Sequence, residues 1–274
     1  MSSTAKKWLL GCGLGCGIPL LLVIAVSLVS GLRMMKPLNE AVDAQKELIA
    51  SFGTRDEWVP PVDGLTPDRL ERFLAVRDSL NPICADFTKI AVKFRNVGEL
   101  DSGGEKAGKL EVLKAAGGVT GAVFSFAGNI GRFTTARNRG LLAAEMGLGE
   151  YIWIYVLAYN SDLGHPPNVD FDDKESDSRY AAQERDVIRG LMARHADALA
   201  EADRGEEADL WRAEAGRLEN SDSDGVPFPD GSLPPEIADK LAPFRAQLDS
   251  LYCTNTSAFE LGRVHKKGPS IRSE

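Results

Sequence analysis

The chain has 274 residues, of which 43% are hydrophobic and 26% charged, and its formal net charge is −8. All 40 acidic residues lie after residue 36, together with 28 of the 32 basic residues. A body with this negative charge repels nucleic acid and anionic lipid, so the composition excludes a nucleic-acid-binding protein. The length after residue 36 is sufficient for one large helical domain or two small ones.

The first segment of the chain is apolar. Residues 8–32 carry no charge, and basic residues stand on both sides of them (Lys6, Lys7, Arg33 and Lys36). At about 1.5 Å per helical residue, this stretch exceeds the roughly 30 Å hydrocarbon core of a bilayer. We therefore predict that residues 1–36 form a short tail and a single transmembrane signal-anchor. A cleaved signal peptide is the alternative, although the apolar run is long for one.

Glycines recur near the start of this predicted span, at Gly11, Gly13, Gly15 and Gly17. Small residues four apart let two helices approach closely in lipid, so these glycines are candidates for helix association. A flexible, kinked start of the span near Pro19 is the simpler explanation of the same residues.

The orientation of the span is not decided by the flanking charges, because the basic residues on its two sides nearly balance. A short tail before an early span is typical of an exported signal-anchor, so we expect an extracytoplasmic body, periplasmic or on the cell surface. Cys84 and Cys253 are the only cysteines outside the span. They are candidates for a disulfide, which would suit an exported body; two separate buried thiols are the alternative.

The first part of the body, residues 37–64, is predicted to hold a juxtamembrane helix and a Pro-rich linker. Leu38, Val42, Ile49 and Phe52 follow a helical period, and Gly53 ends it. The segment after the linker, "LTPDRLERFLAVRDSLNP", begins with a capping residue, a proline and an acid, and so predicts a helix that ends at Pro82. We expect another helix from Pro82 to Phe94.

Helical patterns continue through residues 65–260, which we predict to be one extracytoplasmic domain. The spacing of "YIWIYVLAY" fits either a strand or a helix, and we expect a central core helix because its surroundings are helical. A tyrosine-lined binding groove for peptide or sugar is the alternative to a core position. A long helix is expected from about residue 176, and a last helix from Pro235 through Leu251. Residues 261–274 form a basic tail. The predicted fold is therefore all-α: an N-terminal transmembrane helix followed by an irregular multi-helix bundle.

One short motif resembles a known family. "LTPDR" is similar to the Leu-Thr-x-x-Gln motif of small helical periplasmic chaperones, but Arg69 stands in place of the glutamine. The five residues are also what a well-capped helix start looks like, so no family membership is inferred from them.

Chemical motifs are incomplete in this sequence. In "NSDSDGVPFPDG", Asn220, Asp222 and Asp224 take the first positions of a calcium loop, and Asp230 is the only later candidate, because Gly231 stands where the closing glutamate belongs. A solvated turn explains this loop as well as a weak calcium site does. "GGEKAGKL" lacks the Ser or Thr of a P-loop. We expect His195 to be an interior histidine, and no cofactor is indicated.

These observations predict a membrane-anchored binding or scaffolding protein of the bacterial cell envelope, with a protein partner or self-association. No catalytic residues are identified. The alternatives are an envelope hydrolase that uses scattered carboxylates and a periplasmic chaperone-like helical module.

Overall fold

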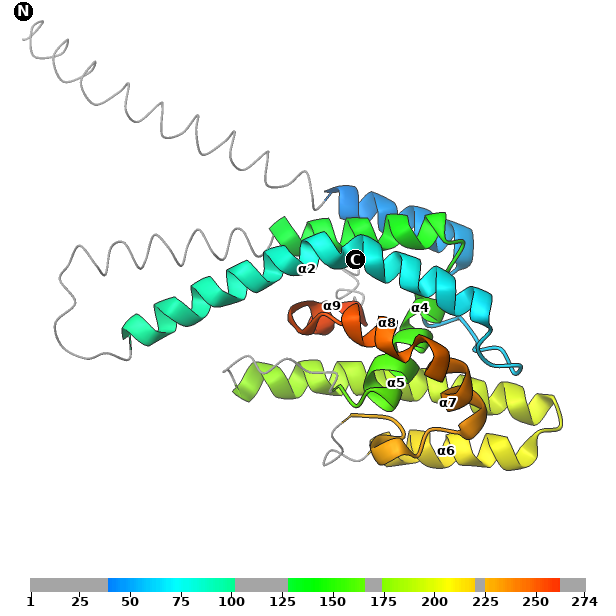
Figure 1. Ribbon diagram of the computed structural model, residues 1–274. Helices are drawn as coiled ribbons and strands as arrows, with labels where there is room; N and C mark the ends of the chain where they lie inside the picture. The colour runs from blue at the N-terminus through cyan, green and yellow to red at the C-terminus, as the bar shows by residue number, and fades with distance from the viewer. Residues whose placement is uncertain (1–38, 102–127, 166–173, 220–224, 262–274) are drawn as a thin grey trace, which may run out of the picture.

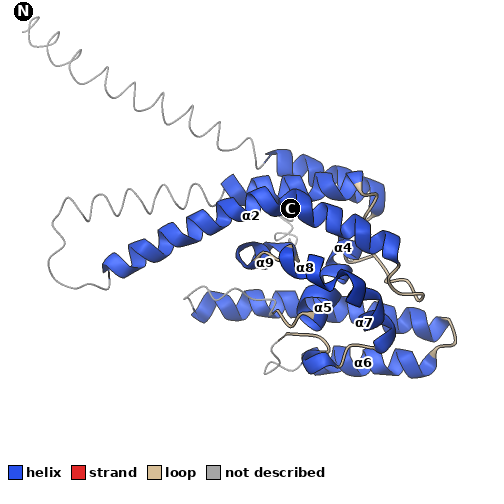
Figure 2. Cartoon of the chain, viewed as in Figure 1, coloured by secondary structure: helices blue, strands red, loops and turns tan. Residues whose placement is uncertain are grey.

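The fold was determined from a computed structural model, which describes residues 39–101, 128–165, 174–219 and 225–261. This part of the chain is all-helical, at 79% helix with no strands, so the predicted all-α class is confirmed (Figure 2). The predicted span at residues 8–32 and the four glycines within it lie outside the described residues.

The helices form three layers (Figure 1). The first layer holds the helix over residues 39–52, α2 (Pro67–Asp101) and the helix Gly128–Ala143. The last layer is an antiparallel hairpin of α5 (Lys174–Glu201) and α6 (Gly205–Glu219). Between them lie α4 (Leu148–Tyr155), its π-helical continuation η1 (Val156–Asp162), and the short C-terminal helices α7 (Pro235–Leu241) and α8 (Arg245–Ser250).

The centre of the core is the segment that the sequence left open between helix and strand. Every residue from Leu148 to Ser161 except Glu150 is buried in α4 and η1. The helical interpretation of "YIWIYVLAY" is thereby confirmed, and its position is in the interior rather than along an open groove. A segment apolar on all sides must be covered on all sides, which is why it occupies the middle layer.

Helix α2 is longer than the sequence predicted. It continues through Pro82 to Asp101, so the predicted end at Pro82 was wrong. Proline removes the hydrogen bond to the carbonyl of Asp78 and typically costs about 3 kcal/mol in a helix interior. Asp78 and Pro82 lie on the exposed side, where water can bind that carbonyl. On the buried side, Leu80 and Phe87 belong to a second apolar cluster that holds the helix together.

The last predicted helix is divided in the structure. The turn η3 (Ala242–Phe244) separates α7 from α8, because Pro243 cannot donate a backbone hydrogen bond. Two further short elements follow, η4 (Thr254–Thr256) and α9 (Ser257–Glu260).

The Pro-rich segment before α2 is fixed to the body by basic side chains. Arg194 of α5 donates to the carbonyl of Trp58 at 2.8 Å, and Lys240 of α7 donates to that of Asp63 at 2.9 Å. Trp58 also packs against the main core. The segment expected to be a linker therefore forms part of the packed structure.

Within the described residues, no single helix is long and apolar enough to cross a bilayer. The helices Gly128–Ala143 and Leu148–Asp162 pass that test only as a pair, and they are bent by 103° at the break between them.

Candidate functional site

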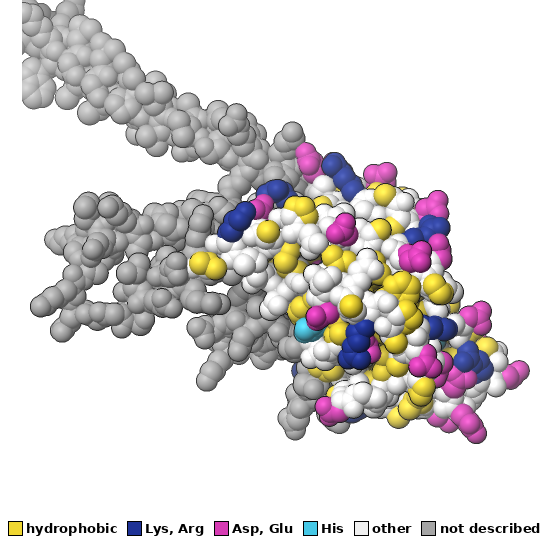
Figure 3. Space-filling view, in the orientation of Figure 1, with side chains coloured by type: hydrophobic (Ala, Val, Ile, Leu, Met, Phe, Trp, Pro, Cys, Tyr) yellow, Lys and Arg dark blue, Asp and Glu magenta, His cyan; other side chains and the backbone are white. Residues whose placement is uncertain are grey.

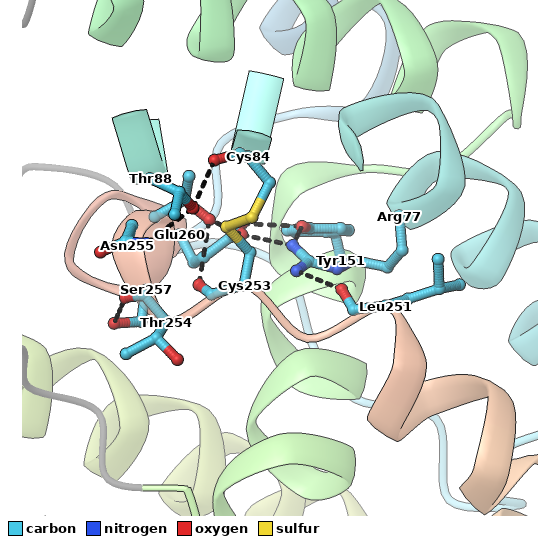
Figure 4. Close-up of a disulfide and its surroundings, with 11 residues drawn as sticks. Arg77, Cys84, Thr88, Tyr151, Leu251, Cys253, Thr254, Asn255, Ser257 and Glu260 are labelled. Atoms are coloured by element: carbon cyan, nitrogen blue, oxygen red, sulfur yellow. Dashed lines mark hydrogen bonds and ion pairs between the residues drawn. A yellow bond between two sulfur atoms is a disulfide. The ribbon is translucent and has the colours of Figure 1, made fainter. Parts of the chain in front are cut away.

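The two cysteines outside the predicted span meet in the structure. Cys84 of α2 and Cys253, just before η4, form a disulfide with a Cα–Cα distance of 6.0 Å across a sequence separation of 169 residues. Cys253 is 4% exposed. The bond fastens the C-terminal segment onto the middle of α2, and polar side chains such as Arg77, Tyr151 and Glu260 lie near it (Figure 4).

A buried ion pair lies beside the disulfide. Arg77 of α2 pairs with Glu260 of α9, and both side chains are almost fully buried, at 1% and 0% exposure. Tyr151 of α4 accepts a hydrogen bond from Arg77 at 2.9 Å and donates one to Oε2 of Glu260 at 2.7 Å. Three elements distant in the sequence therefore meet at one charged centre, which we call the Arg77 cluster (Arg77, Tyr151 and Glu260).

Arginines from three segments hold the backbone of the C-terminal residues. Arg77 donates to the carbonyl of Leu251 at 3.0 Å, and Arg137 donates to that of Glu260 at 2.9 Å. Arg55 donates to the carbonyl of Leu261 at 2.6 Å. Because helix ends leave backbone carbonyls without partners, these guanidinium groups satisfy acceptors that would otherwise be buried unpaired.

Tyrosines continue the cluster along the central helix. The Arg77 guanidinium carbon lies 5.4 Å from the ring centre of Tyr155 and 5.2 Å from that of Tyr159, within cation–π range. Tyr252 packs on Tyr159 and is stacked on His165 with ring centres 3.7 Å apart. The hydroxyl of Tyr155 is buried and has no hydrogen-bond partner among the described residues.

Burial and charge oppose each other at these groups. Burial is the largest single influence and lowers the pKa of Arg77, but Glu260 and the neighbouring tyrosine side chains together outweigh it, so this pKa lies well above its usual value. Burial raises the pKa of Tyr151 in spite of the opposing charge of Arg77. Burial also lowers the pKa of Arg137, where the charge of Glu260 compensates only in part. The tyrosines therefore stay neutral, and Glu260 is the counter-ion of the cluster.

Both carboxylate oxygens of Glu260 accept hydrogen bonds from other side chains of the protein. Its Oε1 accepts from Arg77 and from Thr256, the latter at 3.3 Å, and its Oε2 accepts from Tyr151. A general base must be able to reach a substrate proton. Glu260 is fully buried and already bonded on both oxygens, so this arrangement is suited to clamping the C-terminal segment rather than to acid–base chemistry.

Two other titratable side chains are buried away from this cluster. His195 of α5 lies between Trp153 and Trp211, with ring centres 5.1 and 4.6 Å away, as expected for an interior histidine. Burial lowers the pKa of His195, against a hydrogen bond to the backbone of Pro60. Burial raises the pKa of Glu184 to about 8, and its buried Oε2 has no hydrogen-bond partner among the residues that the structure describes.

The helix over residues 39–52 buries a different face from the one its sequence suggested. Ala41, Ala44 and Leu48 are buried against the body. The larger apolar residues are exposed instead: Val42 by 52%, Ile49 by 40% and Phe52 by 37%. Elsewhere on the visible face, acidic, basic and apolar side chains are interspersed (Figure 3). Small residues let the helix approach the body closely, which leaves Val42 and Ile49 outward, whereas Cβ of Phe52 lies close to Gly147.

The calcium-loop candidates are only partly described. Asp230 is exposed in the turn η2 (Pro229–Gly231), and Asn220, Asp222 and Asp224 lie outside the described residues. Among the residues that the structure places, no group of three or more His, Cys, Asp or Glu side chains could hold a metal ion.

The start of α2 accounts for the chaperone-like motif. The backbone N–H of Arg69 donates to Oγ1 of Thr66 at 3.4 Å, as in a capped helix start. The Arg69 side chain pairs with Glu150 of α4. These residues therefore have structural roles here.

Comparison of the chain with protein-family models, with curated proteins and with solved structures gave no match.

Sequence reasoning missed the Arg77 cluster. Arg77 lies on the apolar face of α2, beside Phe73, Val76 and Leu80. A charged residue on an apolar helix face indicates a buried ion pair, because such residues are rarely buried without a partner. Nothing in the sequence identifies Glu260, 183 residues later, as its partner. The chain holds 40 acidic residues, and only the tertiary structure distinguishes this one.

Proposed function

We propose that this protein is a single-pass, membrane-anchored scaffolding or binding protein of the cell envelope, with residues 8–32 in the membrane and the helical body outside the cytoplasm. Its function in this proposal is to present a rigid helical surface near the membrane to a protein partner. The Arg77 cluster serves to hold that surface together.

The disulfide between Cys84 and Cys253 is the observation that carries this proposal. Disulfides persist in secreted, periplasmic and cell-surface proteins and are rare in the reducing cytosol. The bond is surrounded by a buried ion pair and by arginine contacts to the same C-terminal segment. An exported body explains why this segment is linked covalently to α2.

The binding role is supported by where the described polar and apolar groups lie. The carboxylate of the Arg77 cluster is occupied by internal contacts, whereas bulky apolar side chains are exposed on the helix that follows the predicted span. Exposed apolar residues that share one face are characteristic of interaction surfaces.

Thiol labelling in intact cells tests the proposal. We would express the full chain with Cys12→Ser and Cys16→Ser and treat the cells with a membrane-impermeant maleimide, with and without a prior impermeant reductant. We expect labelling only after reduction, because an exported body has its two cysteines joined. The same chain with Cys84→Ser and Cys253→Ser is the matched control and should never be labelled.

Labelling that requires lysis of the cells would place the body in the cytoplasm and overturn the localisation. Labelling without reduction would leave the body outside but contradict the disulfide. Release of the body from the membrane fraction with the first 30 or so residues missing would instead indicate the cleaved signal peptide.

A further inference from the structure

Two exposed apolar residues of the helix over residues 39–52, Val42 and Ile49, lie on one side of it. Val42 and Ile49 are seven residues apart, and Phe52 follows three residues later. A helix turns by about 100° per residue, so seven residues make nearly two full turns. Val42 and Ile49 therefore lie on the same side of the helix, two turns apart. Phe52 lies about 60° further round the helix, toward the body, and its Cβ is close to Gly147. We therefore call Val42 and Ile49 the outer stripe.

The spacing of the outer stripe continues into the sequence before it. Met35, Leu38, Val42, Gln45, Ile49 and Phe52 alternate in steps of three and four, which is the a/d pattern of a two-stranded coiled coil. Gln45 is the one polar member, and it accepts a hydrogen bond from Asn138 of the body at 2.9 Å. The pattern therefore runs from the end of the predicted span onto the body.

Charged residues on this helix avoid the outer stripe. Asp43 and Glu47 lie about 100° and 140° around the helix from Val42, by the same angular step. On this helix, Lys46 is the only charged residue within about 40° of Val42. The ammonium group of Lys46 forms an ion pair with the carboxylate of Asp43 at 3.5 Å. The stripe is thus apolar along its length, while the acidic residues are on another side.

We propose that the outer stripe is the interface of a parallel homodimer, in which the helices of two copies pair along Val42 and Ile49. This inference rests on the proposed membrane anchor, because two chains that leave one membrane in the same direction present the same helix at the same height. Symmetric pairing brings each residue of the stripe against its own copy, which suits a self-complementary apolar surface.

The chain before the stripe supports a second copy as the occupant. The stripe begins within about ten residues of the end of the predicted span, and that span carries the paired glycines that let helices approach. The membrane surface is a poorer occupant, because a helix that lies on anionic lipid needs basic residues beside its apolar face. Here Asp43 and Glu47 outnumber Lys46 on the exposed side.

Site-directed cross-linking in membranes tests the dimer. In the full chain with Cys12→Ser and Cys16→Ser, Val42→Cys or Ile49→Cys is introduced, and the membranes are treated with copper phenanthroline as oxidant. Each new thiol then loses one electron and one proton to form a disulfide between copies. We expect a dominant dimer band for both variants. Glu47→Cys, on the opposite side of the same helix, is the matched control and should give only a faint dimer band.

Equal cross-linking at residues 42, 49 and 47, or none at 42 and 49, would overturn the proposal. Protection of Val42→Cys from an impermeant maleimide without any dimer band would do so as well, and would indicate lipid as the occupant.

A second variant tests the interface without oxidation. Val42→Lys with Ile49→Lys should shift the full chain in detergent from dimer to monomer in analytical ultracentrifugation. Both side chains are exposed, so the midpoint of chemical unfolding should be unchanged, which separates loss of pairing from loss of folding. A dimer that persists with an unchanged fold would contradict the proposed interface.

The two proposals fail in different ways. A cytoplasmic body in the labelling experiment would end the envelope assignment without affecting cross-linking, because pairing needs only a shared membrane. An exported, disulfide-bonded body without cross-links at residues 42 and 49 would end the dimer alone.

Discussion

Glu260 shows how a buried charge can be retained in a protein of this size. Its carboxylate is 0% exposed, and it is bonded to Arg77, Tyr151 and Thr256. A buried pair of this kind contributes little net stability relative to apolar residues, but removal of one partner leaves the other charge uncompensated. Its effect is to fix which residues meet, because few other arrangements would satisfy Arg77.

Glu260→Gln should therefore be strongly destabilising. We expect the free energy of unfolding to fall by about 3–5 kcal/mol, because Arg77 keeps its charge and loses its counter-ion. Denaturant unfolding of the full chain in detergent measures this. Glu219→Gln is the matched control: it removes an exposed partner of Arg189 and should cost less than about 1 kcal/mol. Equal losses for the two variants would contradict the role of the cluster.

Glu184 gives the opposite case: among the described residues, no counter-ion lies beside its largely buried carboxyl. Its pKa of about 8 lies above the ordinary 4.5, because burial disfavours the charged form. Below pH 4.5 the carboxyl is neutral in the folded and unfolded states and has no effect on stability. As the pH rises from 4.5 to about 8, the unfolded chain loses this proton first, so stability falls.

Glu184→Gln should remove this dependence on pH. We expect the variant to be more stable than the parent by ~2 kcal/mol at pH 8, and by little near pH 5. Unfolding by denaturant at the two pH values measures the difference. Glu201→Gln, an exposed substitution on the same helix, should show no such change between them. A variant that is no more stable at pH 8 would mean that Glu184 is charged and solvated in the fold.

At the scale of elements, close approach between segments depends on small residues. A Cβ atom at Gly149, in the first turn of α4, would lie 2.5 Å from Cβ of Trp58 and 3.2 Å from the carbonyl oxygen of Arg55. The Pro-rich segment can lie over the start of the central helix only because this side chain is absent. Gly216 in α6 differs, because a Cβ atom added there would have no neighbouring atom within 4 Å among the described residues.

The two glycines should respond to alanine with opposite signs. Gly149→Ala is expected to lower the free energy of unfolding by about 1–3 kcal/mol, through overpacking against Trp58. Gly216→Ala should raise it by about 0.5–1 kcal/mol, because alanine favours the helix and meets no neighbour. Thermal or denaturant unfolding of both variants measures the signs. Destabilisation by Gly216→Ala would mean that α6 is packed more tightly than the structure indicates.

At the scale of the whole molecule, the disulfide closes most of the body into one loop. It joins residues separated by 169 positions, between the second half of α2 and the C-terminal segment. A bond that closes so long a loop removes many conformations from the unfolded chain. It also keeps Glu260 close to Arg77, so the covalent link and the ion pair support one another.

Loss of this link should destabilise the whole body. We expect Cys84→Ala with Cys253→Ala to lower the free energy of unfolding by about 2–5 kcal/mol, and reduction of the parent chain to have the same effect. The control is the variant with Cys12→Ser and Cys16→Ser, whose free energy of unfolding should equal that of the parent chain. An unfolding free energy insensitive to reduction would mean that the bond does not form in the protein.

The sequence by itself determined what depends on local pattern. Helical period and capping residues predicted the all-α class, the start of α2 at Pro67 and the central helix of "YIWIYVLAY". These properties follow from neighbours within a few turns of chain, so one sequence is enough to predict them.

Only the tertiary structure decided which distant residues meet. It continued α2 through Pro82, because packing at Leu80 and Phe87 offsets a local penalty, and it buried Ala44 and Leu48 while leaving Val42 and Ile49 exposed. It also selected Glu260 as the partner of Arg77 and brought Cys84 to Cys253. Such pairings depend on the three-dimensional path of the chain, since long-range contacts leave no periodic trace in the sequence.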